Sequence, residues 1–267
     1  MGEAIVITSG KGGVGKTTSS ANIGTALALQ GKKVCLVDTD IGLRNLDVIM
    51  GLENRIIYDL VDVALGKCKL HQALVKDKRF EDKLFLLPAA QTSDKNSVNP
   101  EQMKTIIEEL KKDFDYIIID CPAGIEQGFQ NAIAGADQAI VITTPEVSAV
   151  RDADRIIGLL EKAPIDAPRL VINRIRSNLV KDGDMLDVDE ITNILAIELI
   201  GIVADDDEVI KASNHGEPIV MNPNNKASIA YRNIARRILG DSIPLQHLDE
   251  ESEGIFLKIK RFFSIRS

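Results

Sequence analysis

Two patterns of apolar residues alternate along the chain. In one, apolar residues follow each other without interruption, as in 116–120 (YIIID), which is typical of parallel strands buried between helices. In the other, apolar residues recur every three or four positions, which predicts helices. The patterns predict strands at 4–8, 34–38, 84–88, 116–120, 138–143, 169–173 and 198–203, and helices at 16–30, 100–112, 127–134 and 148–162. This alternation predicts right-handed βαβ units, and so a three-layer α/β fold around a mostly parallel sheet.

The pattern changes after Gly240. Residues 241–253 are polar, with five acidic residues and one proline, and this composition predicts a flexible linker. We therefore expect a globular domain over 1–240, the linker over 241–253, and a separate last segment over 254–267.

The last segment is predicted to form an amphipathic helix. At about 100° per residue, its main apolar side chains fall within an arc of roughly 120°, and its central basic side chains lie outside that arc. This arrangement is typical of helices that lie in the surface of an anionic membrane. A helix that docks on another protein and a helix packed on the domain's own core are the alternatives. The predicted membrane-contacting residues are Ile255, Phe256, Ile259, Phe262, Phe263, Lys258, Lys260 and Arg261.

Composition narrows the class of protein. Of the 267 residues, 45% are hydrophobic, which is enough for a sizeable core, and the net charge of −8 argues against a surface that binds nucleic acid throughout. Cys35, Cys68 and Cys121 form no CxxC pair, so neither a zinc site nor a disulfide framework is indicated. Because the N-terminus has no signal-peptide pattern and no apolar stretch reaches the roughly 20 residues of a membrane span, we expect a cytoplasmic protein.

Residues 10–17 (GKGGVGKT) match the phosphate-binding pattern G-x-x-x-x-G-K-[ST], and they stand between a predicted strand and a predicted helix, as that motif requires. The glycines let backbone N–H groups face a phosphate at the start of the helix. Lys16 is expected to reach the β- and γ-phosphates, and Thr17 to ligate Mg²⁺. The motif predicts a three-layer P-loop NTPase fold. We expect a protein with this motif to bind ATP and Mg²⁺ and to hydrolyse the ATP. The predicted nucleotide contacts in the loop are Gly10, Lys11, Gly12, Gly13, Val14, Gly15, Lys16, Thr17 and Thr18.

Acidic residues stand at the ends of two predicted strands. Asp38 and Asp40 belong to VDTD, and Asp120 ends YIIID. Because the carboxyl ends of parallel strands meet at one edge of a sheet, these carboxylates are expected near the phosphates. An aliphatic run that finishes in aspartate is typical of a Mg²⁺ site in this class, so Asp120 is expected to hold the metal. Solvated capping residues are the alternative for all three.

Lys11 is a second lysine that the ordinary motif does not require. With it, the loop KGGVGKTT resembles the deviant Walker A family of P-loop ATPases, which includes MinD, partition ATPases of the ParA type and the nitrogenase iron protein. The resemblance implies that Lys11 crosses a nucleotide-sandwich dimer to the partner's phosphates, where it neutralises charge only after dimerisation. It implies that Asp40 positions the attacking water and acts in catalysis together with Lys11 and Lys16. It also implies that Asp38 supports the ligands around Mg²⁺. A solvated loop lysine is the alternative for Lys11.

The resemblance extends beyond the loop. Pro122 and Gly124 look like the family's second switch, where Gly124 would offer a backbone N–H to the γ-phosphate. Asn173 matches the position at which the family reads adenine through an amide, and the segment around Pro218 is expected near the base. Three residues match the family's dimer seam and partner-docking helix: Glu146, Ser148 and Asp152. Taken alone, the last of these would suit the start of any helix.

Within this family, the stretches 37–52 and 117–126 and the basic amphipathic C-terminus are most similar to the septum site-determining ATPases of the MinD type. That resemblance implies an ATP-dependent homodimer, peripheral on the cytoplasmic face of the inner membrane. It implies that the dimer recruits MinC, an inhibitor of division-ring assembly, and is released on ATP hydrolysis. The regulator of hydrolysis would be MinE or another polar-landmark system.

Three other classes of protein use the same motif. A ParA-type ATPase that partitions DNA or other cargo would need a basic face, and the acidic balance of the chain stands against it. A P-loop enzyme that passes phosphate to a small molecule, such as a ligase of the dethiobiotin synthetase type, would leave the amphipathic tail without a role. An iron–sulfur carrier of this fold would need paired cysteines, which this sequence lacks.

Overall fold

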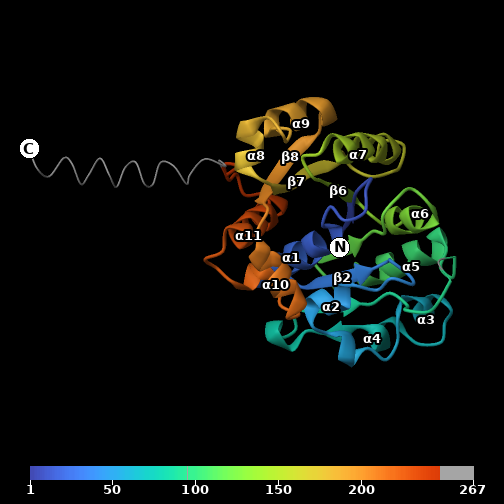
Figure 1. Cartoon of the computed structure of the whole chain (residues 1–267). Coiled ribbons are helices and arrows are strands. Elements are labelled where there is room, and N and C mark those ends of the chain that lie inside the picture. Colours follow the sequence, from blue (N-terminus) through green and yellow to red (C-terminus); the bar gives the residue numbers. More distant parts are fainter. Residues whose placement is uncertain (95, 247–267) are drawn as a thin grey trace, which may run out of the picture.

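The centre of the computed structural model, which describes residues 1–94 and 96–246, is an eight-stranded sheet (Figure 1). The strand order is β3-β4-β2-β5-β1-β6-β7-β8, and every neighbouring pair is parallel except β3 with β4. The strands are β1 (Glu3–Thr8), β2 (Val34–Asp38), β3 (Val75–Lys76), β4 (Leu84–Leu87), β5 (Tyr116–Asp120), β6 (Gln138–Thr143), β7 (Arg169–Ile175) and β8 (Glu198–Ala204). The predicted α/β fold with a mostly parallel sheet is confirmed.

Helices cover both faces of this sheet (Figure 1). The α-helices are α1 (Lys16–Leu29), α2 (Leu46–Met50), α3 (Leu60–Ala64), α4 (Leu70–Ala73), α5 (Pro100–Leu110), α6 (Gln127–Ile133), α7 (Val147–Leu160), α8 (Ser177–Asp182), α9 (Val188–Leu195), α10 (Asp207–Asn214) and α11 (Lys226–Ile238). Short 3₁₀ helices are η1 (Glu53–Arg55), η2 (Lys78–Phe80) and η3 (Ile219–Met221). None of the described helices has the length and apolar character needed to cross a lipid bilayer.

The core is divided by the sheet into two halves, because alternate residues of a strand point to opposite faces. In β1, Ala4 and Val6 pack with α5, α6, α7 and α9, whereas Ile5 and Ile7 pack with α1, α2 and α11. All four side chains are fully buried. This two-sided burial explains why the strands are continuously apolar in sequence.

The predicted strands and helices are present, with ends shifted by one or two residues. The helix α5 begins at Pro100 as expected, and Asn99 and Gln102 form a capping box at its start. The helices α2, α3, α4, α8, α9, α10 and α11 were not predicted, because they are short or carry many polar residues. The expected membrane helix, 254–267, lies outside the described residues, as does the linker from residue 247 onwards.

Candidate functional site

The phosphate-binding loop joins β1 to α1 at the centre of the sheet. Its Gly13 and Gly15 have φ angles of 81° and 95°, in the left-handed region that favours glycine. Gly10 lies against α7, where a Cβ atom would stand only 2.1 Å from the carbonyl oxygen of Asp152. The loop therefore needs these glycines both for its curvature and for its close approach to α7. It leaves the N-terminus of α1 facing the expected phosphate position.

Lys16 lies at the base of the loop and is 7% exposed. Its Nζ donates a hydrogen bond to Ser9 Oγ at 2.9 Å. Burial lowers the pKa of Lys16, whereas the neighbouring Asp120 carboxylate opposes this shift. A buried cation of this kind gains most when a phosphate group arrives, because the dielectric screening is weak there.

Asp38 and Asp120 stand side by side at the ends of β2 and β5, where they are register partners. Asp38 accepts hydrogen bonds from the backbone N–H groups of Asp40 (2.9 Å) and Leu46 (3.2 Å), and Asp120 accepts one from Ser20 Oγ (2.8 Å). Burial is the main cause that raises the pKa of both carboxyls, and the charge of Asp120 raises the pKa of Asp38 further.

The two carboxylates form one oxygen-rich group with Thr17. The Thr17 hydroxyl hydrogen-bonds to Asp120, so hydroxyl and carboxylate oxygens converge at the start of α1. Oxygen ligands of this kind are those that Mg²⁺ prefers. A divalent cation would also neutralise the repulsion between two buried carboxylates, so the residues present fit the expected metal.

We expect Asp120→Asn to stabilise the nucleotide-free protein at pH 8. Burial raises the pKa of Asp120 to about 6, so the folded state binds more protons than the unfolded state between about pH 4 and pH 6. This group therefore lowers stability as pH rises through that range, and the full loss is present at pH 8. The amide removes that repulsion and keeps an acceptor for Ser20, which predicts a gain of about 1 kcal/mol in the free energy of unfolding. Urea denaturation of both proteins at pH 4 and pH 8, with a chelator that removes metal ions, measures the free energy of unfolding.

The same pair of proteins provides the control for that experiment. The difference in stability between variant and wild type should shrink towards pH 4. With Mg-ATP the order should reverse, since only the wild type retains the full metal site and gains from ligand binding. A difference that is the same at both pH values would contradict the assigned cause.

Asp40, Pro122 and Gly124 lie in the two loops that follow β2 and β5. Asp40 is half-buried, and its backbone N–H binds Asp38 as described above. Gly124 has a φ angle of 97°, which a glycine adopts without strain. Pro122 packs against Gly128 at the start of α6, where a Cβ would come within 2.5 Å of the proline ring. The structure therefore brings the predicted switch residues to the same edge of the sheet as the expected metal ligands.

Lys11 lies on the exposed side of the phosphate loop. Its Nζ donates a hydrogen bond to Ser148 Oγ at 3.0 Å, in the first turn of α7. Glu146, directly before α7, is exposed like Ser148, while the Asp152 backbone borders the loop at Gly10. Two of the three residues predicted for the dimer seam, Ser148 and Asp152, thus adjoin the loop.

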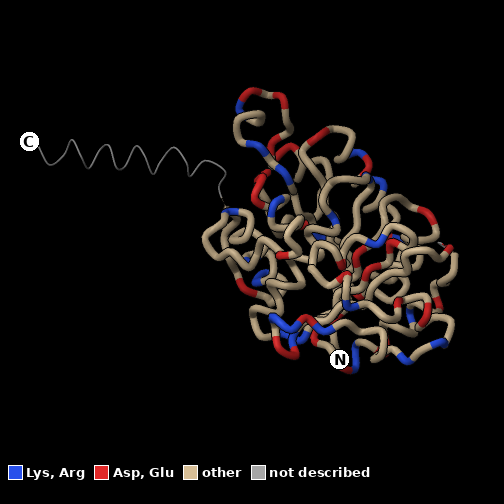
Figure 2. The backbone as a smooth tube through the Cα atoms, turned by 60° about the horizontal axis from the view of Figure 1, so that its bottom comes forward, with Lys and Arg blue, Asp and Glu red and all other residues tan. Residues whose placement is uncertain are grey.

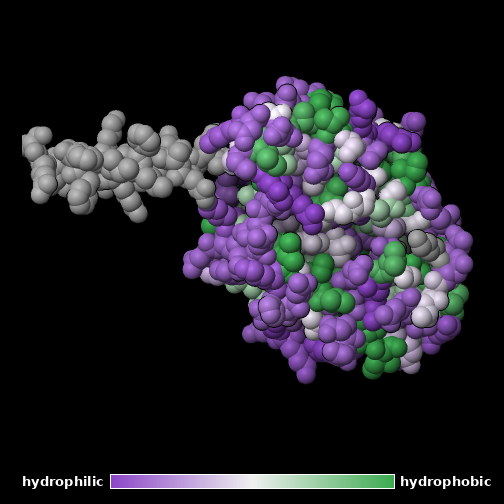
Figure 3. Space-filling model, in the orientation of Figure 1, coloured by the Kyte–Doolittle hydropathy of each residue, from purple (hydrophilic) through white to green (hydrophobic). Residues whose placement is uncertain are grey.

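Exposed apolar side chains surround this edge of the site. Leu43 follows Asp40, Ile125 follows Gly124, and Val147 begins α7, and these three are 60%, 45% and 55% exposed. On the face visible in Figure 3, apolar side chains form small groups within a largely hydrophilic surface. The segments that carry the predicted switch and seam residues therefore also carry unburied apolar surface.

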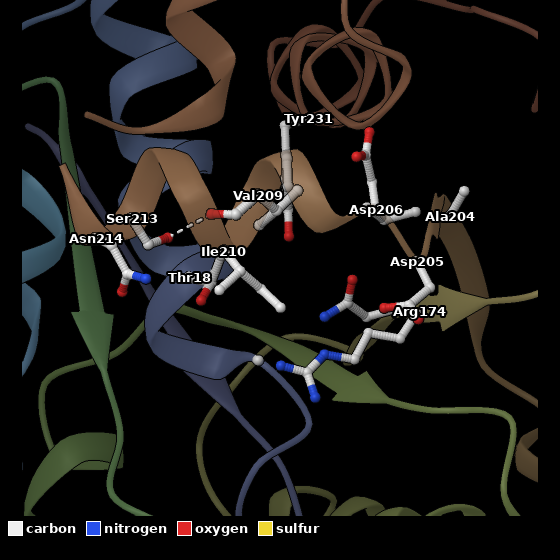
Figure 4. A pocket seen from close by; sticks show the side chains of 13 residues that line it. Thr18, Arg174, Ala204, Asp205, Asp206, Val209, Ile210, Ser213, Asn214 and Tyr231 are labelled. Carbon is white, nitrogen blue, oxygen red and sulfur yellow. Dashed lines mark hydrogen bonds between the residues drawn. The ribbon is translucent and has the colours of Figure 1, made fainter. Parts of the chain in front are cut away.

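A cavity of about 150 Å³ opens beside the loop (Figure 4). The loop contributes Gly15 and Thr18, the end of β7 contributes Asn173, and α10 contributes Val209 and Ile210. The amide nitrogen of Asn173 donates to the carbonyl oxygen of Val14 at 2.8 Å, so this side chain joins the cavity to the loop. The position of the cavity next to the N-terminus of α1 is that expected for a base and ribose.

Several residues of this site were not predicted from the sequence. Tyr231 lines the cavity from α11 and hydrogen-bonds to Ser19 Oγ at 3.2 Å, and Arg174 lines it from β7. Neither residue belongs to a motif, and their separation in sequence gives no signal of their proximity. The cavity is lined by α10 rather than by Pro218, which stands at the start of η3.

Comparison with known proteins agrees with this geometry. A family model described as an AAA domain matches residues 2–166. The septum site-determining protein MinD of Bacillus subtilis is 74% identical over 268 residues, which is 100% of both chains. The structure of a MinC:MinD cell division protein complex from Aquifex aeolicus has a TM-score of 0.86 at 51% identity and covers 92% of this chain and 98% of that one. Septum site-determining MinD of Pyrococcus horikoshii, complexed with Mg-ADP, has a TM-score of 0.81 at 30% identity, covering 89% and 96%.

The fold and the site are those of a P-loop ATPase that uses Mg²⁺. Its relatives match this chain over nearly its full length. The chain belongs to the MinD family of septum site-determining proteins.

Proposed function

We propose that this protein is a membrane switch that dimerises with ATP, recruits a division inhibitor of the MinC type, and is released by hydrolysis. It would act as a peripheral protein on the cytoplasmic face of the inner membrane. The observation that carries the proposal is the contrast between its two loop lysines. Lys16 is buried at the phosphate site, whereas Lys11 is exposed and bonded to Ser148.

This contrast supports a role for Lys11 in a second molecule. A cation that already faced its own phosphates would act in the monomer, but Lys11 lies on the outer side of the loop. In a face-to-face dimer each Lys11 would leave Ser148 and neutralise the partner's γ-phosphate, as an arginine finger does. The exposed Leu43, Ile125 and Val147 would be buried by the same contact.

Hydrolysis would then depend on the strand-end acids. Thr17, Asp38 and Asp120 would hold Mg²⁺, which would offset the negative charge of the phosphates. Asp40 would orient the water whose oxygen attacks the γ-phosphorus. The bond from that phosphorus to the β–γ bridging oxygen breaks, and ADP and phosphate leave. The amide nitrogen of Asn173 already donates a hydrogen bond to Val14. Its amide oxygen would therefore accept a hydrogen bond from the exocyclic amine of adenine.

Two surfaces would connect this cycle to its partners. The N-terminal half of α7, with Ser148 and Asp152, borders the loop, and together with Glu146 directly before the helix it would form the docking site for MinC. The MinC:MinD complex of Aquifex aeolicus supports this choice of partner. Residues 254–267, as an amphipathic helix behind the linker, would attach the dimer to anionic lipid.

A partition ATPase that coats DNA is not favoured. In Figure 2 basic and acidic residues are interspersed around the described chain, and the net charge is −8. Binding to DNA draws its affinity from lysine and arginine side chains that neutralise phosphates. The full-length relatives are septum site-determining proteins.

Asp40→Ala is expected to hold the protein on membranes with its partner. Without the group that positions water, ATP turnover should fall by about 100-fold or more, so the ATP-bound dimer would persist. Co-sedimentation of the full chain and a purified MinC protein with anionic vesicles, followed over time after a limited addition of ATP, measures this. Wild-type protein should leave the pellet as ATP is consumed, and the variant should stay. Unchanged turnover in the variant would remove Asp40 from the mechanism.

A further inference from the structure

Arg79 joins two helix ends that border different parts of the candidate site. It lies in η2, where the buried carboxylate of Asp77 accepts hydrogen bonds from its Nε at 3.0 Å and its Nη2 at 2.7 Å. The same guanidinium also reaches two backbone carbonyls, because Nη1 donates to Gly216 at 2.9 Å and Nη2 donates to Met50. Met50 ends α2, and Gly216 stands two residues beyond α10. One cation thus fastens the C-terminal ends of two helices, where the helix dipoles favour positive charge.

The two helix ends also touch each other directly. Gly51 and Gly216 have φ angles of 65° and 68°, in the left-handed region. A Cβ atom at Gly216 would stand 2.6 Å from the Cα of Gly51, and a Cβ atom at Gly51 would stand 2.8 Å from the carbonyl oxygen of Gly216. Figure 1 shows α2 and α10 side by side. Because the backbones are in contact, a displacement of one helix end is transmitted to the other.

The opposite end of α2 is held by an expected metal ligand. The carboxylate of Asp38 accepts a hydrogen bond from the backbone N–H of Leu46, the first residue of α2, at 3.2 Å. Leu46 and Met50 are fully buried, so α2 is a short, tightly packed element between Asp38 and Arg79. A ligand that reorients the Asp38 carboxylate would therefore act on the whole of α2.

The helix α10 has few other contacts that fix its position. None of its residues is buried, although Val209 and Ile210 form a wall of the cavity beside the phosphate loop (Figure 4). Its start is held by Asp206, which accepts a hydrogen bond from Asn225 at 2.7 Å. Its end is held by Arg79. Because an element with little buried surface opens more readily than the core, the Arg79 contact sets the position of this wall.

We propose that Arg79 is a positioning residue that couples the expected metal site to the cavity, so that Mg²⁺ and phosphate at one end tighten α10 around a base at the other. The path runs from Asp38 through α2 to Arg79, and from Arg79 through α10 to the cavity. The inference rests on the proposed placement of Mg²⁺, phosphates and base. Such a coupling is reciprocal, so Mg²⁺ strengthens binding of the base by the same factor as the base strengthens binding of Mg²⁺.

Arg79→Ala tests the coupling in the full-length protein. Isothermal titration calorimetry measures the affinities for ADP and for inorganic pyrophosphate, which lacks the base, each with Mg²⁺ and with a chelator. ADP is chosen because ATP is expected to add dimerisation. In the wild type, Mg²⁺ should strengthen ADP binding by about 5- to 10-fold more than it strengthens pyrophosphate binding. In Arg79→Ala the two gains should be equal. Arg79→Lys should behave like the alanine variant, because an ammonium group lacks the planar fork that binds a carboxylate and two carbonyls together.

Hydrogen exchange gives a second readout, which a uniform loss of stability would not reproduce. Saturating Mg²⁺ and pyrophosphate occupy only the phosphate end of the site, yet they should slow exchange of the α10 amides by about 5-fold in the wild type. The same ligands should leave exchange of these amides unchanged in Arg79→Ala.

Arg237→Ala is the matched control. Arg237 also donates to backbone carbonyls, those of Ile200 at 2.9 Å and Pro244 at 2.7 Å, but it lies on α11 next to β8 and away from this path. Its variant should lose stability and keep the wild-type coupling. Equal gains for ADP and pyrophosphate in the wild type, a wild-type excess in Arg79→Ala, or loss of the excess in Arg237→Ala would overturn the proposal. A wild type that does not bind ADP would overturn the nucleotide site itself, and the coupling with it.

Discussion

Lys11→Ala is expected to leave the protein monomeric with ATP and to lower ATP turnover by about 10³-fold, the scale of a cation supplied in trans. The variant should still bind one ATP, because Lys16 and the backbone of the loop are untouched. Two negatively charged nucleotides that face each other across a dimer repel, and the two exposed Lys11 side chains are the cations placed to offset this repulsion. Light scattering with ATP and ADP, together with phosphate release, measures both effects.

Lys112→Ala is the matched control for that experiment. Lys112 is exposed like Lys11, but it precedes β5 and so belongs to the opposite edge of the sheet. Its variant should dimerise and hydrolyse ATP as the wild type does. An ATP-dependent dimer of Lys11→Ala would refute the role in trans, and a variant that no longer binds ATP would point to a role of Lys11 within its own loop.

The parts of this site that the sequence predicts are those that depend on contiguous residues. The loop at 10–17 is recognisable because the spacing of its glycines and Lys16 is required by one backbone shape. Asp38 and Asp120 are recognisable because each ends an apolar run, and the parallel sheet then brings them side by side as register partners. The fold and the expected metal site follow from patterns of this local kind.

The cavity beside the phosphate loop could not be predicted in the same way. Its walls come from the loop, the end of β7, α10 and α11, and Gly15 and Tyr231 are far apart in sequence. The strained conformation of Arg174 is likewise invisible in the sequence, because arginine gives no signal for a positive φ angle as glycine does. Such features are set by how helices pack on the sheet, and not by any local pattern.

Deletion of residues 254–267 is expected to abolish binding to anionic vesicles and to leave ATP binding intact. The deleted segment carries the apolar face and the basic residues of the predicted helix, and each basic residue near an anionic surface contributes about 1 kcal/mol. The nucleotide site lies wholly within the described domain, so it should not be affected. Co-sedimentation with vesicles and calorimetric titration with ATP measure the two properties on the same preparations.

The full-length chain should bind vesicles in a way that depends on the bound nucleotide. A short helix is marginal in water, so one copy should bind lipid weakly, whereas two copies on one dimer gain roughly 10²- to 10⁴-fold in avidity. Sedimentation should therefore be strong with ATP, weak with ADP, and weak with ATP for Lys11→Ala, which keeps the tail but not the dimer. Replacing Phe262 and Phe263 by alanine keeps every charge and should still weaken binding, because the apolar face supplies insertion. Equal sedimentation of the full and shortened chains would refute the membrane role, and equal sedimentation with ATP and ADP would refute its control by dimerisation.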